Sequence, residues 1–366
     1  MKKVFLYAYT CQNLGDDLFV HTITKRYPDV KFYLWSDVTN ISTFRRLTNL
    51  KVINNDSRYI RLLHKIRPSL VSRYRSKKEQ SCEAVVYIGG SLFIEYDNWE
   101  TILTWWDFEA KNRNFFVMGA NFGPYKTEAY RESLSKIFSY MKDVCFRDEY
   151  SFSMFCDNPK VRYAPDILLG IEMPERTDFK KSVFVSVIDC QDKSEGVNQF
   201  SVFEDQYLSF IFCAIKSFLS AGYHIFLASF CKAEGDENAI HKLLSKFDMS
   251  VAQTDIDVIN YDGTNSDEML QTISNSDYVL ASRFHAAILG FAARKPVLPV
   301  VYSDKTIHVL RDFHFKGRVI DLRCLKSVST EILIQEKEKQ LFDRIDYYRE
   351  KSYEQFAVLD RQLHNH

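Results

Sequence analysis

The sequence predicts an α/β protein made of two Rossmann-like domains that face a central cleft. Short apolar strands alternate with helical stretches, an order typical of parallel sheets joined by right-handed crossovers. A polar segment with a proline, 170–176, interrupts the alternation, which begins again at 182–187. The length of 366 residues is enough for two domains of ordinary size.

The N-terminal domain is expected to span residues 1–175. Its strands are the short apolar runs, and its helices are the longer stretches between them. We expect strands at 4–8, 31–35, 84–88, 114–119, 144–146 and 162–163, and helices at 17–26, 127–141 and 148–158.

The C-terminal domain is expected to span residues 176–325, because the same pattern repeats there. We expect strands at 182–187, 224–229, 278–281 and 297–302, and helices at 204–221, 236–246 and 286–293. The remaining stretch, 326–366, is charged and is predicted to be a helical tail that packs back across a domain face.

The composition excludes several classes of protein. Hydrophobic residues make up 46% of the chain, so general disorder is not expected. The 48 basic and 48 acidic residues balance, which argues against a nucleic-acid-binding protein held by bulk charge. No segment reaches the roughly 18 uncharged apolar residues of a membrane-spanning helix, and the N-terminal apolar run is too short for a signal peptide. We therefore expect a soluble, cytoplasmic protein.

Eight cysteines are scattered along the chain without the spacing of a zinc site. Most of them fall in expected strands or helices, so buried, reduced thiols are expected, as in a cytosolic protein. No metal site is expected.

The most informative segment, 282–289, places Arg283 and His285 between an apolar strand and an uncharged helix. In α/β folds such a turn lies at the carboxyl edge of the sheet, where ligands bind, and the free N–H groups of the new helix favour anions. A guanidinium suits phosphate or carboxylate, and histidine can also carry a proton. A surface arginine and a core histidine are the alternative. The apolar surroundings favour a functional role, because burying unpaired charges there would be costly.

Segment 13–17 follows the first expected strand and opens the first helix. Gly15 can take a sharp turn, and Asp16 or Asp17 lies near the helix start. A carboxylate at this strand end can reach a sugar hydroxyl, or it can simply cap the helix. Both interpretations remain open.

Further candidates follow other strands. Gly89, Gly90 and Ser91 form either a ligand-binding turn or only a tight turn. Segment 121–124 is a similar glycine-containing turn after the next expected strand. Arg147 can reach an anion or form a surface ion pair, with Asp148 as the helix cap. Lys305 follows the strand at 297–302, and its flexible ammonium suits a mobile phosphate.

The stretch 57–78 is basic and contains no aspartate or glutamate. One interpretation is a solvated, partly disordered insertion. The other is a basic amphipathic patch that contacts anionic lipid heads or a lipid-linked pyrophosphate acceptor. Its cations are Arg58, Arg61, Lys65, Arg67, Arg73, Arg75, Lys77 and Lys78.

Taken in order, these motifs resemble the polysaccharide pyruvyl transferase family. The matching pieces are Asn13-Leu14-Gly15-Asp16, Gly89-Gly90-Ser91, Gly123-Pro124, Arg147-Asp148, Pro165-Asp166, Arg283-Phe284-His285-Ala286 and Tyr302-Ser303-Asp304-Lys305. Each is weak alone, but their order over roughly residues 4–310 is specific. One departure is Ile88, which replaces the first of three glycines in the family's glycine-rich turn.

The resemblance implies a glycosyltransferase-B-like arrangement and transfer of pyruvate from phosphoenolpyruvate onto two hydroxyls of a sugar. The products would be a pyruvate ketal and phosphate. The acceptor would be a bacterial surface polysaccharide or its lipid-linked precursor, with peripheral membrane contact through 57–78 at the inner membrane face in the second case. No cofactor is implied beyond the donor substrate.

Roles for individual residues follow from this resemblance. The expected catalytic residues are His285, Arg283 and Asp16. The expected donor-binding residues are Arg283, His285, Ala286, Lys305 and Arg147. The expected acceptor-binding residues are Asn13, Gly15, Asp17, Gly89, Gly90 and Ser91.

An alternative is a glycosyltransferase-B-type enzyme that uses a nucleotide sugar, since it would also place an anion clamp in the C-terminal domain. Such a donor needs an acidic residue near the following helix to hold the ribose, and 286–293 contains none. A catalytically inactive sugar-binding module fits poorly, because both anion ligands and the carboxylate are present.

Overall fold

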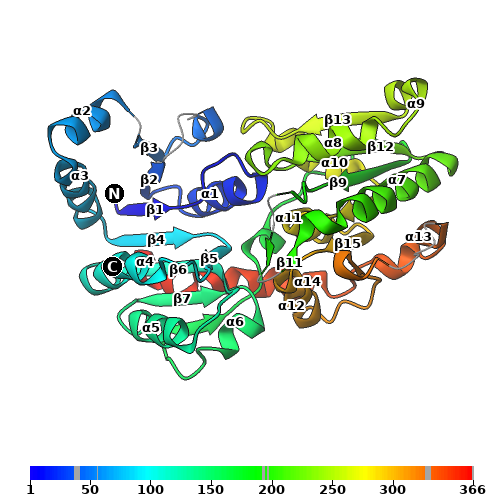
Figure 1. Ribbon diagram of the computed structural model, residues 1–366. Coiled ribbons are helices and arrows are strands. Elements are labelled where there is room, and N and C mark those ends of the chain that lie inside the picture. The colour runs from blue at the N-terminus through cyan, green and yellow to red at the C-terminus, as the bar shows by residue number, and fades with distance from the viewer. Residues whose placement is uncertain (37–41, 56, 192–193, 196–197, 326–330, 365–366) are drawn as a thin grey trace. The chain divides into compact units, whose positions relative to one another are not determined.

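A computed structural model of the chain describes residues 1–36, 42–55, 57–191, 194–195, 198–325 and 331–364. The chain divides into two compact units, each built on its own parallel sheet (Figure 1). Unit 1 comprises Met1–Cys11, Asp16–Ile167 and Glu350–His366, and unit 2 comprises Gln12–Gly15 and Leu168–Arg349. The division after Ile167 precedes the predicted boundary at 175, and the segment 12–15 belongs to unit 2 because it pairs with that unit's backbone.

The sheet of unit 1 is parallel and has the strand order β3-β2-β1-β4-β6-β7-β8, with β5 beside β6. The strands are β1 (Lys3–Tyr7), β2 (Lys31–Ser36), β3 (Leu50–Asn54), β4 (Ala84–Ile88), β5 (Ser91–Phe93), β6 (Phe115–Phe122), β7 (Asp143–Phe146) and β8 (Val161–Tyr163). We did not predict β3 and β5. β3 is an edge strand with little buried surface, and β5 has only three residues, so neither gives a clear apolar run.

Helices cover both faces of this sheet. They are α1 (Leu14–Arg26), α2 (Arg58–Ile66), α3 (Pro68–Gln80), α4 (Trp99–Asn112), α5 (Glu128–Phe138) and α6 (Glu149–Ser153). α6 is shorter than the predicted helix at 148–158, and α4 was not predicted. The basic stretch 57–78 is helical through most of its length, so the expected partial disorder is not observed, and the lipid-contacting interpretation stays a prediction.

The sheet of unit 2 is also parallel and has the order β13-β12-β9-β14-β15-β16. Its strands are β9 (Ser182–Ser186), β12 (His224–Ser229), β13 (Ile256–Asn260), β14 (Tyr278–Ala281), β15 (Val297–Val301) and β16 (Ile320–Asp321), and a small hairpin is formed by β10 (Ser194–Glu195) and β11 (Asn198–Gln199). The predictions for β12 and β14 are confirmed to the residue, because both are buried strands with apolar residues through their middle.

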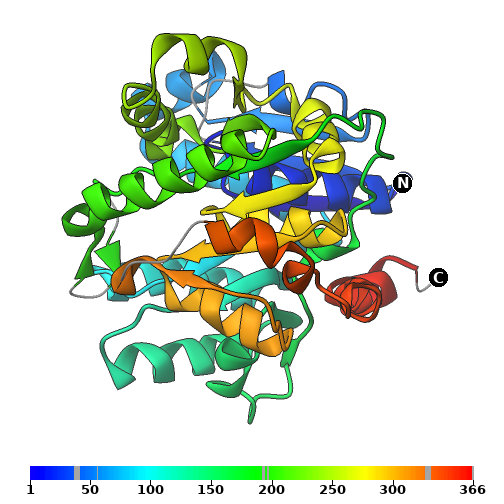
Figure 2. The same cartoon turned by 90° about the vertical axis from the view of Figure 1, so that its right-hand side faces the viewer.

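The helices of unit 2 also lie on both faces of its sheet. They are α7 (Glu204–Ser220), α8 (Asp236–Leu244), α9 (Met249–Thr254), α10 (Ser266–Asn275), α11 (Phe284–Ala292), α12 (Asp304–Asp312) and α13 (Glu331–Gln335), and α14 (Ile345–Ser352) runs across the unit boundary. α7 and α8 pack on the face that carries Val183 and Leu280, and Figure 2 shows the green α7 across that face. α11 packs on the opposite face, against Val279 and Val297.

Both sheets have a topological switch point. In each, the first strand (β1 or β9) lies in the middle, with the next two strands on one side and the fourth (β4 or β14) on the other. The loops that leave such neighbouring strands diverge, and α/β folds bind ligands in the resulting crevice at the carboxyl ends of the strands. Gly89 and Gly90 follow β4, and Arg283 and His285 follow β14. The sequence motifs therefore lie at the switch points.

The C-terminal segment returns to unit 1. Gln355 is buried there, where its side-chain oxygen accepts from the Gly119 amide at 2.9 Å and its nitrogen donates to the Ala164 carbonyl at 2.6 Å. Beyond it, α15 (Ala357–His364) is held by Asp360, whose carboxylate pairs with Arg26 at 2.7 Å. Residues 326–330, where we placed the start of the tail, lie outside the described residues.

The cysteines are all free, but only Cys145, Cys190 and Cys231 are buried. The expectation of generally buried thiols is therefore wrong, because the other cysteines lie on the outward sides of their elements or in loops. Among the described residues, no helix is long and apolar enough to cross a membrane.

Candidate functional site

The turn after β14 is fixed by hydrogen bonds from the neighbouring strand. The Ser186 hydroxyl, at the end of β9, accepts from the backbone amides of Ser282 and Arg283 at 3.1 and 3.2 Å. The Ser282 hydroxyl in turn accepts from the buried Tyr207 hydroxyl at 2.8 Å. The start of α11 therefore has a defined position at the switch point of unit 2.

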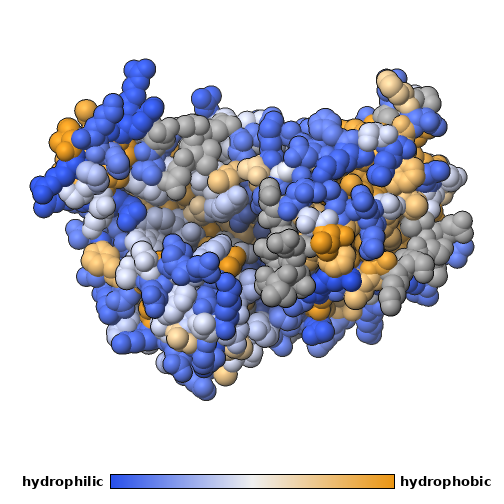
Figure 3. All heavy atoms as spheres, viewed as in Figure 1, coloured by the Kyte–Doolittle hydropathy of each residue, from blue (hydrophilic) through white to orange (hydrophobic). Residues whose placement is uncertain are grey.

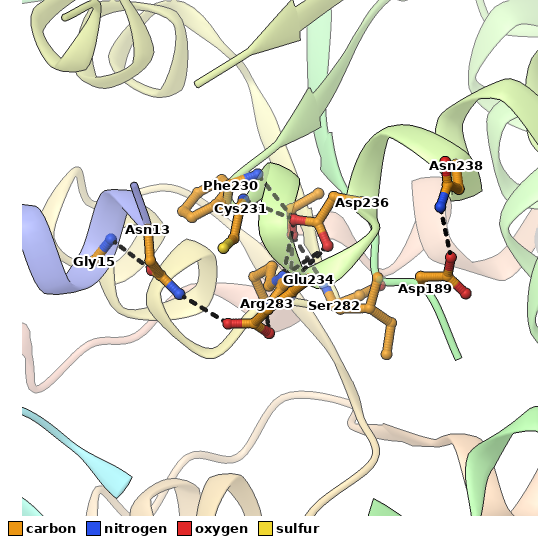
Figure 4. A network of polar contacts seen from close by, with 12 residues as sticks. Asn13, Gly15, Asp189, Phe230, Cys231, Glu234, Asp236, Asn238, Ser282 and Arg283 are labelled. Carbon is orange, nitrogen blue, oxygen red and sulfur yellow. Dashed lines mark hydrogen bonds and ion pairs between the residues drawn. The ribbon is translucent and has the colours of Figure 1, made fainter. Parts of the chain in front are cut away.

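Arg283 is buried and held by two carboxylates (Figure 4). Its side chain is 7% exposed and pairs with Asp236, which is fully buried, and with Glu234, which is 30% exposed. The Arg283 Nε lies 3.0 and 3.1 Å from the two Asp236 oxygens, and an Nη donates to each carboxylate. The guanidinium is therefore paired with both carboxylates, and burial raises the pKa of the Asp236 carboxyl above its ordinary value.

Asp236 is itself fixed by the backbone. Its carboxylate accepts from the amides of Phe230 and Cys231, both at 3.0 Å. Gly235, just before it, has φ of +81° and lies where a Cβ would stand 2.8 Å from Asp189. Only glycine fits this turn without strain, so the start of α8 presents Asp236 to Arg283 in one position.

These contacts change the interpretation of Arg283. Burial disfavours its charge, but the attraction of Asp236 and Glu234 outweighs this and raises the pKa of Arg283 well above its ordinary value. Its donors already serve protein carboxylates, so gripping a phosphate would require Glu234 to move away. A direct donor-binding role stays a prediction, and the observed contacts are those of a positioning residue.

The N-terminal motif joins the same cluster. The Leu14 amide donates to the Phe230 carbonyl at 3.1 Å, and Asn13 forms a β-bridge with Cys231. The Asn13 side chain donates to Glu234 at 3.3 Å, while its oxygen accepts from the Gly15 amide at 3.1 Å. Glu234 therefore links the motif at Asn13 to the motif at Arg283. Two of the predicted acceptor-binding residues, Asn13 and Gly15, lie in unit 2 with all the predicted donor-binding residues except Arg147.

Gly15 packs directly against the imidazole of His285. A Cβ built on Gly15 would lie 1.7 Å from His285 Nδ1 and 2.2 Å from its Cγ, which is far inside van der Waals contact. His285 is half-buried in the first turn of α11. The absence of a side chain at Gly15 therefore creates the space that the imidazole occupies.

Gly15→Ala should displace this imidazole. Alanine suits the first turn of α1, so the expected effect is steric and centred on His285. We expect turnover to fall by roughly the 10²-fold or more that is typical of a lost acid–base group. Steady-state kinetics of Gly15→Ala, His285→Ala and the double variant would test this. The double variant should be no slower than His285→Ala alone, and additive losses would show that the two residues act separately.

Asp16 and Asp17 differ in accessibility. Asp17 is 1% exposed, whereas Asp16 is half-buried in the first turn of α1. Asn13, directly before the helix, supplies the side-chain oxygen that accepts from the Gly15 amide. Of the two carboxylates, Asp16 is the more available to a substrate.

The remaining predicted residues of unit 2 lie near the same edge of the sheet. Lys305 is half-buried in the first turn of α12. The Ala286 amide already donates to the Arg283 carbonyl at 3.1 Å.

A second cluster lies at the switch point of unit 1. Arg147 is 3% exposed, pairs with Asp166 at 3.0 Å and donates to the Asn121 side chain at 3.1 Å. A Cβ on Gly90 would lie 2.5 Å from the Arg147 guanidinium. The ion pair that we considered for Arg147 exists, but it is buried rather than on the surface. Asp148 caps α6 as predicted, accepting from the Ser151 amide at 2.7 Å.

This cluster unites four of the sequence motifs. The glycine-rich turn, the Arg-Asp pair, the Pro-Asp pair and Asn121 meet at the ends of adjacent strands. Ser91 is exposed beside it, and Ile88 is the buried last residue of β4. Arg147 belongs to unit 1 and Arg283 to unit 2, so their joint role at one donor stays a prediction.

Glu234 and Asp236 were not predicted as site residues from the sequence. Two acidic residues just after the strand at 224–229 were a signal that this segment could face a cation. Linking them to Arg283 required the sheet order, because β9 separates β12 from β14. Ser186 was missed for the same reason.

Comparisons with known proteins agree with this architecture. A family model described as polysaccharide pyruvyl transferase matches residues 13–304. A comparison with curated protein sequences found no match.

Solved structures that resemble the chain include Anabaena HepE in complex with UDP and glucose, with a TM-score of 0.57 and 9% identity over 100% of this chain and 98% of that one. S. aureus MnaA with UDP has a TM-score of 0.56 and 12% identity over 100% and 97%. A UDP-GlcNAc 2-epimerase from Methanocaldococcus jannaschii has a TM-score of 0.53 and 10% identity over 93% and 90%. At such identities the likeness shows the fold alone, which is glycosyltransferase-B-like.

Proposed function

Because the chain belongs to the polysaccharide pyruvyl transferase family, we propose that it moves pyruvate from phosphoenolpyruvate onto two hydroxyls of one sugar. Both hydroxyl oxygens bond to the central carbon of the donor, and the bond from that carbon to the phosphate oxygen breaks. Of the two hydroxyl protons, one reaches the methylene carbon, which becomes a methyl group, and the other leaves with phosphate. The products are a cyclic pyruvate ketal and inorganic phosphate.

The observation that carries this proposal is the extent of the family match. It begins at Asn13 and includes Arg283 and His285, and these distant segments meet through Glu234 in unit 2. A chance likeness in one motif would not bring two segments so far apart in the chain to one cluster. The reacting atoms would then lie beside His285.

We assign the chemical roles by what each side chain offers. His285 is half-buried beside Gly15 and can hold or release a proton, so it is the proposed general acid toward the methylene carbon. Asp16 is the proposed base toward the attacking hydroxyl. Lys305 is the proposed cationic partner of the donor's phosphate, because Arg283 is already paired with Glu234 and Asp236. A role for Arg147 at the donor would require it to leave its buried pair with Asp166.

The acceptor is a saccharide, as the family indicates. We propose that it belongs to a bacterial surface polysaccharide or to the lipid-linked precursor of one. Gly89, Gly90 and Ser91, together with Asn13 and Gly15, are the proposed acceptor contacts.

Ligand-induced stabilisation tests the donor. Phosphoenolpyruvate should raise the melting temperature of the full chain, because a ligand at a hundred times its Kd stabilises the native state by about 2.7 kcal/mol. UDP-sugars and GDP-sugars should have no comparable effect. With a saccharide acceptor, phosphate release should accompany the appearance of ketal-bound pyruvate. Stabilisation by a nucleotide sugar, without any response to phosphoenolpyruvate, would instead establish the glycosyltransferase alternative.

Asp16→Asn should lower turnover by roughly 10²–10⁴-fold if this carboxylate takes the hydroxyl proton. The melting shift with phosphoenolpyruvate should persist, because the donor does not need the base. Asp29→Asn, which changes an exposed carboxylate of the same unit, is the matched control and should keep wild-type turnover. Normal turnover in Asp16→Asn would restrict Asp16 to a structural role in the first turn of α1.

A further inference from the structure

The helices α2 and α3 form a hairpin on unit 1 that is anchored from one side. Ile60 is 3% exposed and belongs to the hydrophobic core of the unit, and Leu63, Val71 and Tyr74 pack against that core. The rings of Tyr59 and Tyr74 meet with centroids 5.8 Å apart. The hairpin is therefore an ordered part of the unit.

Two of its cations belong to this anchor. Arg75 lies 3.5 Å from Glu79, whose side chain is fully buried and also accepts from Arg113. The Lys78 ammonium lies 5.2 Å from the ring centroid of Tyr33, and the Arg75 guanidinium lies 5.8 Å from that of Trp35. Arg75 and Lys78 therefore pack against unit 1 and are not counted among the cations on the solvent-facing side of the hairpin.

The outer side of α2 carries large apolar side chains. Tyr59 is 56% exposed, Leu62 is 55% exposed and Ile66 is 65% exposed. Successive residues of an α-helix are about 100° apart, so positions 59, 62 and 66 form one stripe along the helix. Figure 3 shows orange side chains among blue ones over this part of the molecule, at the upper left.

Cations line the edge of this apolar stripe. On the same helical spacing, Arg58, Arg61 and Lys65 form the adjoining stripe, and all are exposed. Arg67, Arg73 and Lys77 add exposed positive charge on the hairpin. The sequence from 57 to 78 contains no acidic residue, although the whole chain is electrically neutral. Positive charge is therefore concentrated beside exposed apolar surface.

We propose that the α2–α3 hairpin docks the protein on an anionic lipid bilayer. Arg58, Lys65, Arg73 and Lys77 would face lipid phosphates, and the stripe of Tyr59, Leu62 and Ile66 would enter the boundary between headgroups and acyl chains. A bilayer is the occupant that matches both features. A soluble polyanion would satisfy the cations and leave the apolar stripe in water. This inference rests on the hairpin alone and does not depend on the proposed function.

Vesicle sedimentation of the full chain tests the proposal. Binding should be strong with vesicles of mixed phosphatidylcholine and phosphatidylglycerol and weak with phosphatidylcholine alone. A quadruple charge variant combines Arg58→Gln, Lys65→Gln, Arg73→Gln and Lys77→Gln. It should bind the anionic vesicles roughly fivefold more weakly for each cation removed. The pair Leu62→Ser, Ile66→Ser should weaken binding about tenfold, since two side chains lose partial burial. Raised salt should weaken wild-type binding as the charge variant does.

Matched variants elsewhere on the chain distinguish a loss of binding specific to the hairpin from a general effect of removing charge or apolar surface. A second quadruple variant removes the same number of exposed cations from other parts of unit 1: Lys51→Gln, Lys136→Gln, Lys142→Gln and Lys160→Gln. Val202→Ser, Met249→Ser changes side chains that are 70% and 73% exposed. Both controls should bind like the wild type. Three outcomes would overturn the proposal: no binding of the wild type to anionic vesicles, an equal loss in the controls, or unchanged binding of the Leu62, Ile66 variant.

Discussion

His285→Ala should lower pyruvyl transfer by roughly 10²–10⁴-fold, the range typical of a general acid or base. His285 lies in the first turn of α11 at the switch point of unit 2, and the bare backbone of Gly15 makes room for its ring. Its half-buried position leaves the imidazole accessible to a ligand. Steady-state kinetics with phosphoenolpyruvate and a saccharide acceptor would measure the loss, mainly in kcat.

Stability should change little in this variant, since a half-buried side chain without a role in the core contributes about 1 kcal/mol or less. His241→Ala provides the matched control, because His241 is an exposed histidine on α8 of the same unit. It should keep both turnover and melting temperature. Wild-type turnover in His285→Ala would remove His285 from the chemistry and leave it as a packing partner of Gly15.

Arg283→Ala should destabilise the protein by about 3–5 kcal/mol, the cost of leaving a buried charge without its partner. Removing the guanidinium leaves Asp236, which is fully buried, and Glu234 without their cation. From the sequence we expected Arg283 to bind the donor. The burial of Arg283 changes that expectation, and chemical denaturation of the protein without ligands would measure the loss.

The control for this experiment is Arg294→Ala, two residues beyond the end of α11. Arg294 also pairs with a carboxylate, Asp346, but the two side chains are 54% and 69% exposed. An exposed pair contributes about 0–1 kcal/mol, so this variant should be nearly as stable as the wild type. Combining Arg283→Ala with Asp236→Asn should recover part of the lost stability. Equal stabilities of the two alanine variants would mean that Arg283 is not held by the carboxylates and is free to bind a donor.

The sequence predicted the order of elements well because the signal for a buried strand is local. The strands at 84–88, 224–229 and 278–281 were predicted with the observed bounds, since each is a short, buried and largely apolar run. The edge strand β3 and the three-residue β5 were missed because burial on one side leaves little pattern to detect.

The candidate site was predicted in part. The motifs 13–16, 89–91 and 283–286 do lie at the carboxyl ends of strands that flank the switch points. Their grouping was not predicted, because Asn13 reaches unit 2 through backbone pairing with Cys231. Strand pairing between such distant positions leaves no trace in either local sequence.

The sequence by itself determined the fold class, the position of most strands and the presence of Arg283 and His285 at a helix start. An arginine on an apolar background must find an anion, and the sequence established that need. Only the tertiary structure decided which anion meets it, by bringing Glu234 and Asp236 across β9 to the guanidinium. That Arg283 needs an anionic partner follows from the residue and its apolar sequence neighbours. Which carboxylates become its partners depends on the order of the strands in the sheet, which brings together residues far apart in the chain.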